Sequence, residues 1–187
     1  MNSTELTHLI VSWVTLSLAF TFYSYAFGFT ALAQLPVMLL AVGTAFILHE
    51  LAHKYVAIHY NAHAEFRMWE LGLLLAVFFA VFRDLGLFFA APGAVYVFGP
   101  HLSRKQHGHV SIAGPATNFV LGLAFLYFGM VFPGLQWVLL PVSKINFFLG
   151  AFNMVPFPPL DGSKVMAWNP LVWGLSFALF WGAVFFI

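Results

Sequence analysis

Residues 35–58 read LPVMLLAVGTAFILHELAHKYVAI, and this stretch indicates the fold class of the chain. Its first half carries no charged side chain and is typical of a helix inside a membrane. His49, Glu50, His53 and Lys54 then interrupt the apolar run. Because ionisable side chains inside a membrane-spanning helix are costly, they usually serve a function. The stretch therefore predicts a membrane-spanning helix that carries a functional site.

The composition of the whole chain agrees with a membrane protein. Of 187 residues, 62% are hydrophobic and 7% are charged, and the mean hydropathy is +0.92. Soluble domains carry roughly 25% charged residues, so the composition excludes a soluble globular domain, a disordered chain and a nucleic-acid binder. Cysteine is absent, so a metal site would have to use histidine and carboxylate ligands. We expect one intramembrane domain over residues 1–187, with membrane lipid as a partner and the oligomeric state left open.

Five apolar stretches are candidates for membrane-spanning helices, because a crossing needs about 20 apolar residues. They cover residues 9–29, 35–58, 110–132, 135–155 and 168–187. We therefore expect an all-α polytopic membrane protein with about five spans.

A sixth apolar segment, residues 71–98, has a different pattern. Arg83 and Asp84 lie near its middle, Pro92-Gly93 is a turn signal, and residues 95–98 favour a strand. We expect a β-hairpin that enters the membrane without crossing it, between the second and third spans. Since strand edges are not tolerated in lipid, its backbone must pair with protein or with a bound peptide.

The positive charges predict an orientation. The connection between the second and third spans carries Arg67, Arg83, Arg104 and Lys105, and Lys164 follows the fourth span. The first-to-second and third-to-fourth connections carry no lysine or arginine. The positive-inside rule then places the N-terminus and the long connection in the cytoplasm. We expect a multi-pass protein of the cell membrane with its active site toward the cytoplasmic side.

Residues 49–53 form an H-E-x-x-H motif. Positions i and i+4 share a helix face, so His49 and His53 can bind one zinc ion, and Glu50 beside it can take a proton from water. The alternative is a polar cluster that only joins neighbouring helices. Three ionisable groups within five residues need a common partner, however, and a cation supplies it.

A catalytic zinc ion needs a third protein ligand and an open position. The remaining histidines and acidic residues are the candidates: His8, His59, His63, His101, His107, His109, Glu5, Glu65, Glu70, Asp84 and Asp161. Asp161 follows the fourth span on the same predicted side, and three prolines at 156, 158 and 159 unwind the chain before it. A simple turn at Asp161-Gly162 is the alternative. His101, His107 and His109 are a possible second metal site, or part of a solvated loop near lipid headgroups.

Three motifs follow one another along the chain. The first is His49 to His53 within a span, the second is the G-P-x-x-N element from Gly114 to Asn118, and the third is Asn153 with the proline-rich run that ends at Leu160-Asp161-Gly162. In this order they resemble the site-2 protease family of intramembrane zinc metalloproteases, in its minimal prokaryotic form without a PDZ domain. The resemblance covers about residues 35–162, the expected catalytic core.

The resemblance implies a role for each matching residue. His49, His53 and Asp161 would bind zinc, and Glu50 would be the general base. Asn153 would hold the substrate or the oxyanion near the metal, although an asparagine in a span also commonly bonds a neighbouring helix. Helix packing and support are the expected roles of the Gly114 to Asn118 element.

The resemblance also implies an architecture. The family has up to six spans and a membrane-reentrant β element, which residues 71–98 resemble. Its strand edge would pair with an extended substrate and replace the hydrogen bonds that the substrate helix loses; the alternative is a hairpin that plugs the cavity.

We therefore expect an intramembrane zinc endopeptidase, with one zinc ion per chain, that hydrolyses peptide bonds within or near transmembrane segments of protein substrates. The competing interpretation is a metal transporter of the ZIP kind, whose spans also carry H-E-x-x-H-like pairs. A transporter should spread ligands along a route to both sides. Here the half away from the motif offers little beyond Gln136, Lys144 and Asn146. An inactive binding scaffold is disfavoured because all the expected catalytic residues are present.

Overall fold

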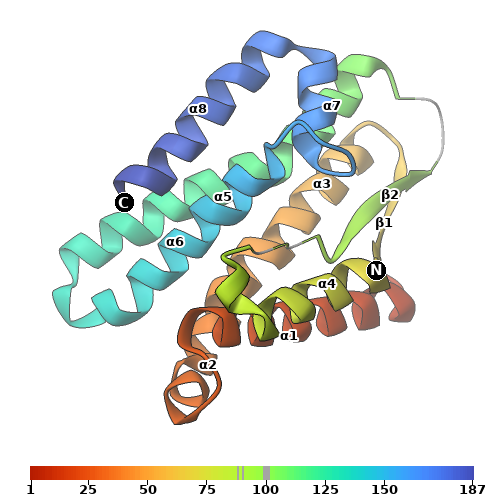
Figure 1. Cartoon of the computed structure of the whole chain (residues 1–187). Coiled ribbons are helices and arrows are strands. Elements are labelled where there is room, and N and C mark those ends of the chain that lie inside the picture. The colour runs from red at the N-terminus through yellow and green to blue at the C-terminus, as the bar shows by residue number, and fades with distance from the viewer. Residues whose placement is uncertain (88, 90, 99–101) are drawn as a thin grey trace.

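The computed structural model describes residues 1–87, 89, 91–98 and 102–187 (Figure 1). Its elements are α1 (Ser3–Tyr25), α2 (Phe29–Val42), the π-helical turn η1 (Gly43–Ile47), α3 (Leu48–His59), β1 (His63–Met68), α4 (Glu70–Val81), η2 (Arg83–Leu85), β2 (Gly93–Phe98), α5 (Arg104–Val131), η3 (Pro133–Leu135), α6 (Gln136–Asn153), α7 (Asp161–Trp168) and α8 (Pro170–Phe186). The chain is thus mostly helical, as predicted.

Four helical segments of the described chain are long and apolar enough to cross a membrane. They are Ser3–Tyr25, Phe29–His59, Arg104–Val131 and Pro133–Asn153. The second combines α2, η1 and α3 in one continuous helix. The expected fifth span corresponds to α8, which has 17 residues. At 1.5 Å per residue α8 is about 26 Å long, less than the roughly 30 Å of a hydrocarbon core. The structure gives four candidate spans where the sequence predicted about five, and a crossing by α8 stays a prediction.

The expected hairpin over residues 71–98 is corrected by the structure. The strand near residues 95–98 is present as β2, but its antiparallel partner is β1, which precedes the expected hairpin. Helix α4 lies between the two strands along the chain, although the strands pair directly with each other. The reason is local: residues 73–81 are a continuous apolar run without glycine or proline, and nothing there stops a helix. Residues 88 and 90 of the expected hairpin lie outside the described residues, and entry into the membrane stays a prediction.

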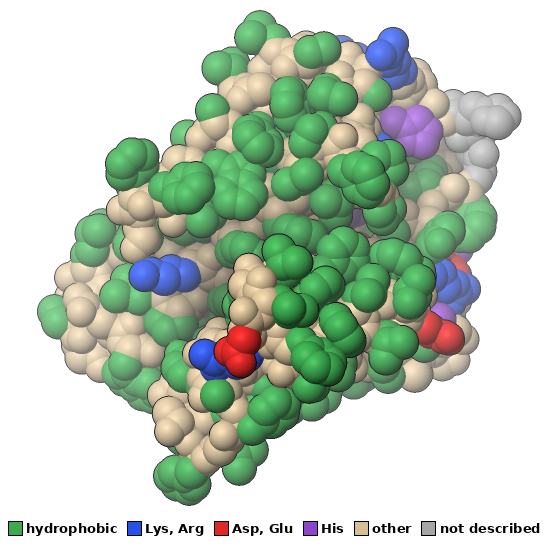
Figure 2. Space-filling view, viewed as in Figure 1, with side chains coloured by type: hydrophobic (Ala, Val, Ile, Leu, Met, Phe, Trp, Pro, Cys, Tyr) green, Lys and Arg blue, Asp and Glu red, His purple; other side chains and the backbone are tan. Residues whose placement is uncertain are grey.

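The helices form two groups, one around α5 and one around α1. Helix α5 contacts α3, α6 and α7, and α8 packs against α6 and α7, while α1 and α4 lie together beside the sheet (Figure 1). One buried apolar cluster joins α1, α2, α4 and β1, and another joins the end of α6 to α7 and α8. The face of the molecule shown in Figure 2 is covered largely by apolar side chains, with few charged groups. Such a surface is what a lipid environment requires, and the chain is a membrane protein.

Candidate metal centre

Three predicted ligands meet where α3, α5 and α7 come together. His49 and His53 lie one turn apart on α3, and their Nε2 atoms are 2.9 Å apart. Asp161, the first residue of α7, brings Oδ2 to 3.3 Å from His49 Nε2 and 3.0 Å from His53 Nε2. All three side chains are buried. The proline-rich segment between α6 and α7 has no helical structure, and this turn of the chain lets Asp161 reach the α3 face.

The spacing of these atoms fits one zinc ion. Ligands bound to tetrahedral zinc at about 2.0–2.1 Å are separated from one another by roughly 3.3 Å. The three measured separations, 2.9, 3.0 and 3.3 Å, are close to that value. Within the described parts of the chain, this is the only group of three or more histidine and acidic side chains that could hold a metal ion. Two nitrogens and one carboxylate oxygen are also a donor set that zinc accepts.

Helix α5 supports both histidines from behind. His53 Nδ1 lies 2.7 Å from the carbonyl oxygen of Val110, and His49 Nδ1 lies 2.5 Å from Asn118 Oδ1. Since a carbonyl oxygen only accepts, each Nδ1 donates, and each Nε2 keeps its lone pair for a metal. Gly114 lies between these two positions on the same face of α5. A Cβ there would stand 2.6 Å from His49 Nε2 and closer still to His53 Nε2, so no side chain fits at this position.

A buried chain of hydrogen bonds extends from Asn118 into α6. The Asn118 amide donates to the Ala45 carbonyl in η1 at 2.7 Å and to Asn146 Oδ1 at 3.3 Å. Asn146 in turn donates to Thr44 Oγ1 at 3.1 Å. The π-helical turn thus offers a carbonyl group to Asn118 one turn before His49. Because each partner is satisfied, the position of the His49 ring is determined by three helices rather than by α3 alone.

Glu50 lies beside the ligands with one oxygen free. Its side chain is buried, and Oε2 has no hydrogen-bond partner among the residues that the structure describes. Glu50 and the three ligands line a cavity of about 570 Å³, and residues 91–97 on and before β2 form another part of its wall. Asn153 lines the same cavity, and its Nδ2 donates to the Leu149 carbonyl at 3.0 Å. An acid beside a metal-ligand set in a cavity can exchange protons with a water molecule held there.

The charge of Asp161 is set by its surroundings. Burial opposes ionisation, but the charge of the neighbouring His53 and the hydrogen bonds donated by the two histidine rings, whose Nε2 protons a bound metal would replace, outweigh it and hold the pKa of the Asp161 carboxyl well below its ordinary value. Lys164, one turn further along α7, adds to this effect with its Nζ 3.6 Å from Asp161 Oδ1. The carboxylate is therefore ionised and ready to bind a cation.

Comparison with known proteins assigns the chain to a family. It is 41% identical over 174 residues to MJ0611 of Methanocaldococcus jannaschii, a protein named as a zinc metalloprotease; the match covers 91% of this chain and 87% of that protein. The chain belongs to the site-2 protease family. It is also 27% identical to YwhC of Bacillus subtilis over 75% of this chain and 72% of that one, and 26% identical to the zinc metalloprotease MJ0392 of M. jannaschii over 70% and 33%. No protein-family model and no solved structure matches the chain.

Membership in the site-2 protease family makes this chain a zinc metalloendopeptidase with zinc as its cofactor. The transporter alternative has no support, since the relatives are named as zinc metalloproteases. The suggested second metal site has none either in the described residues: His107 lines the catalytic cavity, and His109 Nδ1 is 2.6 Å from the Tyr60 hydroxyl. His101 lies outside the described residues.

Sequence reasoning assigned the α5 element to packing and support, and did not identify its direct contact with the two histidines. The G-P-x-x-N pattern was the available signal, because Gly114 and Asn118 lie one turn apart and face the same way. Nothing in the sequence singled out Val110, which acts through its backbone carbonyl.

Proposed function

We propose that the chain is an intramembrane zinc endopeptidase that cuts peptide bonds within or near the transmembrane segments of protein substrates. The observation that carries the proposal is the buried His49, His53 and Asp161 triangle beside a Glu50 oxygen without a partner in the described structure, all within one cavity. The three ligands lie on elements of candidate spans or directly after one. These positions place the site within reach of a transmembrane segment of a substrate protein.

His49, His53 and Asp161 would hold the zinc ion. When bound, zinc polarises a carbonyl group and lowers the pKa of a water molecule. Glu50 then takes the proton of the attacking water through Oε2 and delivers it to the nitrogen of the leaving amine. The Asn153 amide has two hydrogens, of which Leu149 takes one. The second is available to a substrate carbonyl or to the oxyanion that develops on it.

The substrate would bind as an extended strand. A peptide bond inside a helix is hidden by the hydrogen bonds of the helix, so the segment must unwind before it can be cut. Strand β2 lines the catalytic cavity and, among the described residues, pairs with β1 along one edge only. Addition of a substrate strand to the other edge would replace the lost hydrogen bonds. The arginines and lysines between the second and third spans favour a cytoplasmic position for the end of the molecule that carries the metal centre.

The decisive experiment is cleavage of a tagged single-span membrane protein by the purified chain in liposomes, with Glu50→Gln in parallel. We expect zinc-dependent product from the parent, and a loss of at least about a thousandfold in rate for Glu50→Gln because its amide cannot accept a proton. Zinc content by elemental analysis should be equal in both proteins. Robust cleavage by Glu50→Gln would remove Glu50 from its role. If a chelator left the parent activity unchanged, zinc catalysis itself would be excluded.

A further inference from the structure

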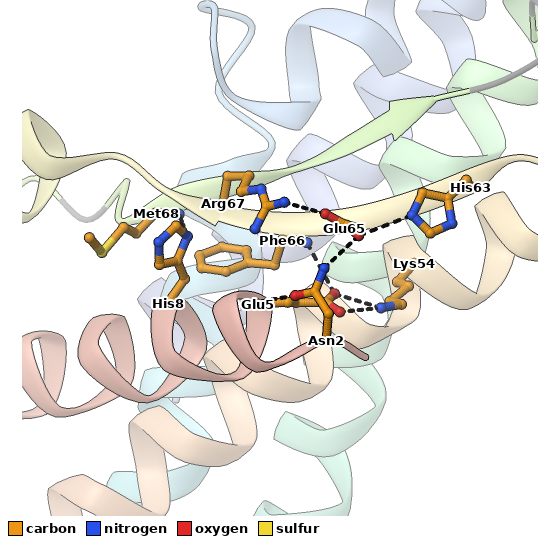
Figure 3. Close-up of polar contacts among 9 residues, drawn as sticks. All are labelled: Asn2, Glu5, His8, Lys54, His63, Glu65, Phe66, Arg67 and Met68. Atoms are coloured by element: carbon orange, nitrogen blue, oxygen red, sulfur yellow. Dashed lines mark hydrogen bonds and ion pairs between the residues drawn. The ribbon is translucent and has the colours of Figure 1, made fainter.

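A second buried polar cluster lies outside the metal centre, where α1, α3 and β1 meet (Figure 3). Glu5, in the first turn of α1, is 1% exposed. Both of its carboxylate oxygens accept from Lys54 Nζ at 2.6 Å, and Oε1 also accepts from the Phe66 backbone N–H at 3.1 Å. In Figure 3 the side chains of Glu5 and Lys54 point toward each other below β1. One carboxylate thus connects three elements.

These contacts form a continuous path from the sheet, whose strand β2 would bind the substrate, to α3, the helix that carries the two histidine ligands. Lys54 directly follows the ligand His53 on α3. On the other side of Glu5, Phe66 stands opposite Val95 in the β1–β2 register, and Val95 lines the catalytic cavity. Neither Glu5 nor Lys54 lines that cavity. The two side chains can therefore act on catalysis only by holding other groups in place.

The same helix also occupies the outer edge of β1. Hydrogen-bond directions alternate along a strand, so the N–H groups of Phe66 and Met68 point the same way, toward α1. Glu5 accepts from Phe66, and His8 Nδ1 accepts from Met68 at 3.4 Å. Helix α1 thus accepts from two of the outward N–H groups on the outer edge of the sheet. The edge left for another strand is that of β2, on the cavity side.

An ion pair buried this deeply is a poor source of stability, since desolvation of both charges offsets their attraction. Buried pairs of this kind are better known for selecting one register among several. Here the elements whose register matters are the sheet and α3. A shift between them would move every residue of a paired substrate relative to the metal centre.

We propose that Glu5 and Lys54 are positioning residues that hold the β2 edge in one register against the zinc-ligand helix, and so determine which substrate peptide bond is cut. This inference rests on the proposed function. It predicts that loss of the pair changes where and how tightly a substrate binds, while the metal centre stays intact.

The test uses the full chain in liposomes with the single-span substrate, and it compares Glu5→Gln with the parent. We expect unchanged zinc content, a KM raised roughly tenfold through lost preorganisation, and a kcat within about twofold of the parent. Mass spectrometry of the products should show cleavage spreading to bonds about two residues away, since that slip keeps the same strand face toward the cavity. A merely structural role would lower the active fraction and move neither KM nor the cleavage position.

Two further variants keep the test decisive. The double variant Glu5→Gln with Lys54→Met leaves no unpaired charge, so it should fold where Glu5→Gln does not, and it should show the same spread of products. Glu65→Gln is the matched control: Glu65 lies on the same strand and, in the described structure, bonds Asn2 at the start of α1, His63 and Arg67, but no residue of α3. We expect the parent cleavage position in Glu65→Gln.

A measurement without substrate separates this inference from the proposed function. In the double variant, hydrogen exchange of residues 63–68 and 93–98 should be faster than in the parent. Hydrogen exchange at the parental rate in the double variant would overturn the inference. Cleavage at the parental position in the double variant would overturn it as well. If the parent itself cut no membrane substrate, the proposed function would fail, and hydrogen exchange would still show whether the pair holds the sheet.

Discussion

At the scale of single residues, the metal centre depends on residues that are not themselves metal ligands. Asn118 holds the Nδ1 side of His49, and the carbonyl of Val110 does the same for His53. Each contact leaves an Nε2 lone pair pointing at the shared site. Gly114 contributes through its missing side chain, because a Cβ would fill the space that the two rings occupy.

We predict that Asn118→Ala lowers zinc affinity by about 10–100-fold, the usual cost of losing a partner behind a metal-ligating histidine. Competition with a chromophoric chelator would measure it. Thr117→Ala is the matched control, because the Thr117 hydroxyl donates to the Ala113 carbonyl within its own helix. Equal zinc affinity in the two variants would contradict the role of Asn118.

At the scale of elements, α5 supports the metal ligands and the small sheet forms another wall of the cavity. Helix α5 carries Val110, Gly114 and Asn118 at intervals of one turn, so a single helix face supports the ligands. The sheet faces the same cavity from another side through β2. The register opposes Phe66 to Val95, and since the Phe66 N–H points to α1, the Val95 N–H points to the free edge of β2.

We predict that Val95→Pro reduces kcat/KM about fivefold, the equivalent of one lost hydrogen bond of about 1 kcal/mol. Proline is tolerated at an edge position whose N–H does not join the ladder, so the β1–β2 pair should survive. Val95→Thr keeps both the N–H and the branched shape and should behave as the parent. Steady-state cleavage of the single-span substrate measures the difference; parental kinetics in Val95→Pro would argue against strand addition at this edge.

At the scale of the whole molecule, the apolar surface and the placement of cations predict how the chain sits in a bilayer. Lys105 lies in the first turn of α5, and Gly134 lies in η3 at the other end of that helix. The Cβ of a side chain at position 134 would meet open space. The two positions therefore mark opposite ends of one candidate span.

The absence of cysteine makes the orientation directly testable. We predict that Lys105→Cys reacts with a membrane-impermeant maleimide only from the cytoplasmic side, and that Gly134→Cys reacts only from the opposite side. Labelling of intact and of inverted membrane vesicles measures this, with the cysteine-free parent as the blank. The reverse pattern would overturn the predicted orientation, without bearing on the chemistry.

Local patterns in the sequence determined the membrane class and the two histidine ligands, and the family resemblance added Asp161 as the third. His49 and His53 share a helix face because four residues make about one turn, and no tertiary contact is needed for that. Residues 71–98 were harder to predict. Their turn signals are real, but strand pairing is non-local, and only the folded chain shows that β2 pairs with β1 across α4.

Only the tertiary structure decided which residues from distant segments of the chain come into contact. The arrival of Asp161 at the two histidines, the support of Asn118 for His49, and the connection of Glu5 to Lys54 all join residues far apart in the chain. A residue pattern records the chemistry that each side chain can perform and the face on which it lies. Which faces meet is determined by packing over the whole molecule, and this information is not contained in any single stretch of sequence.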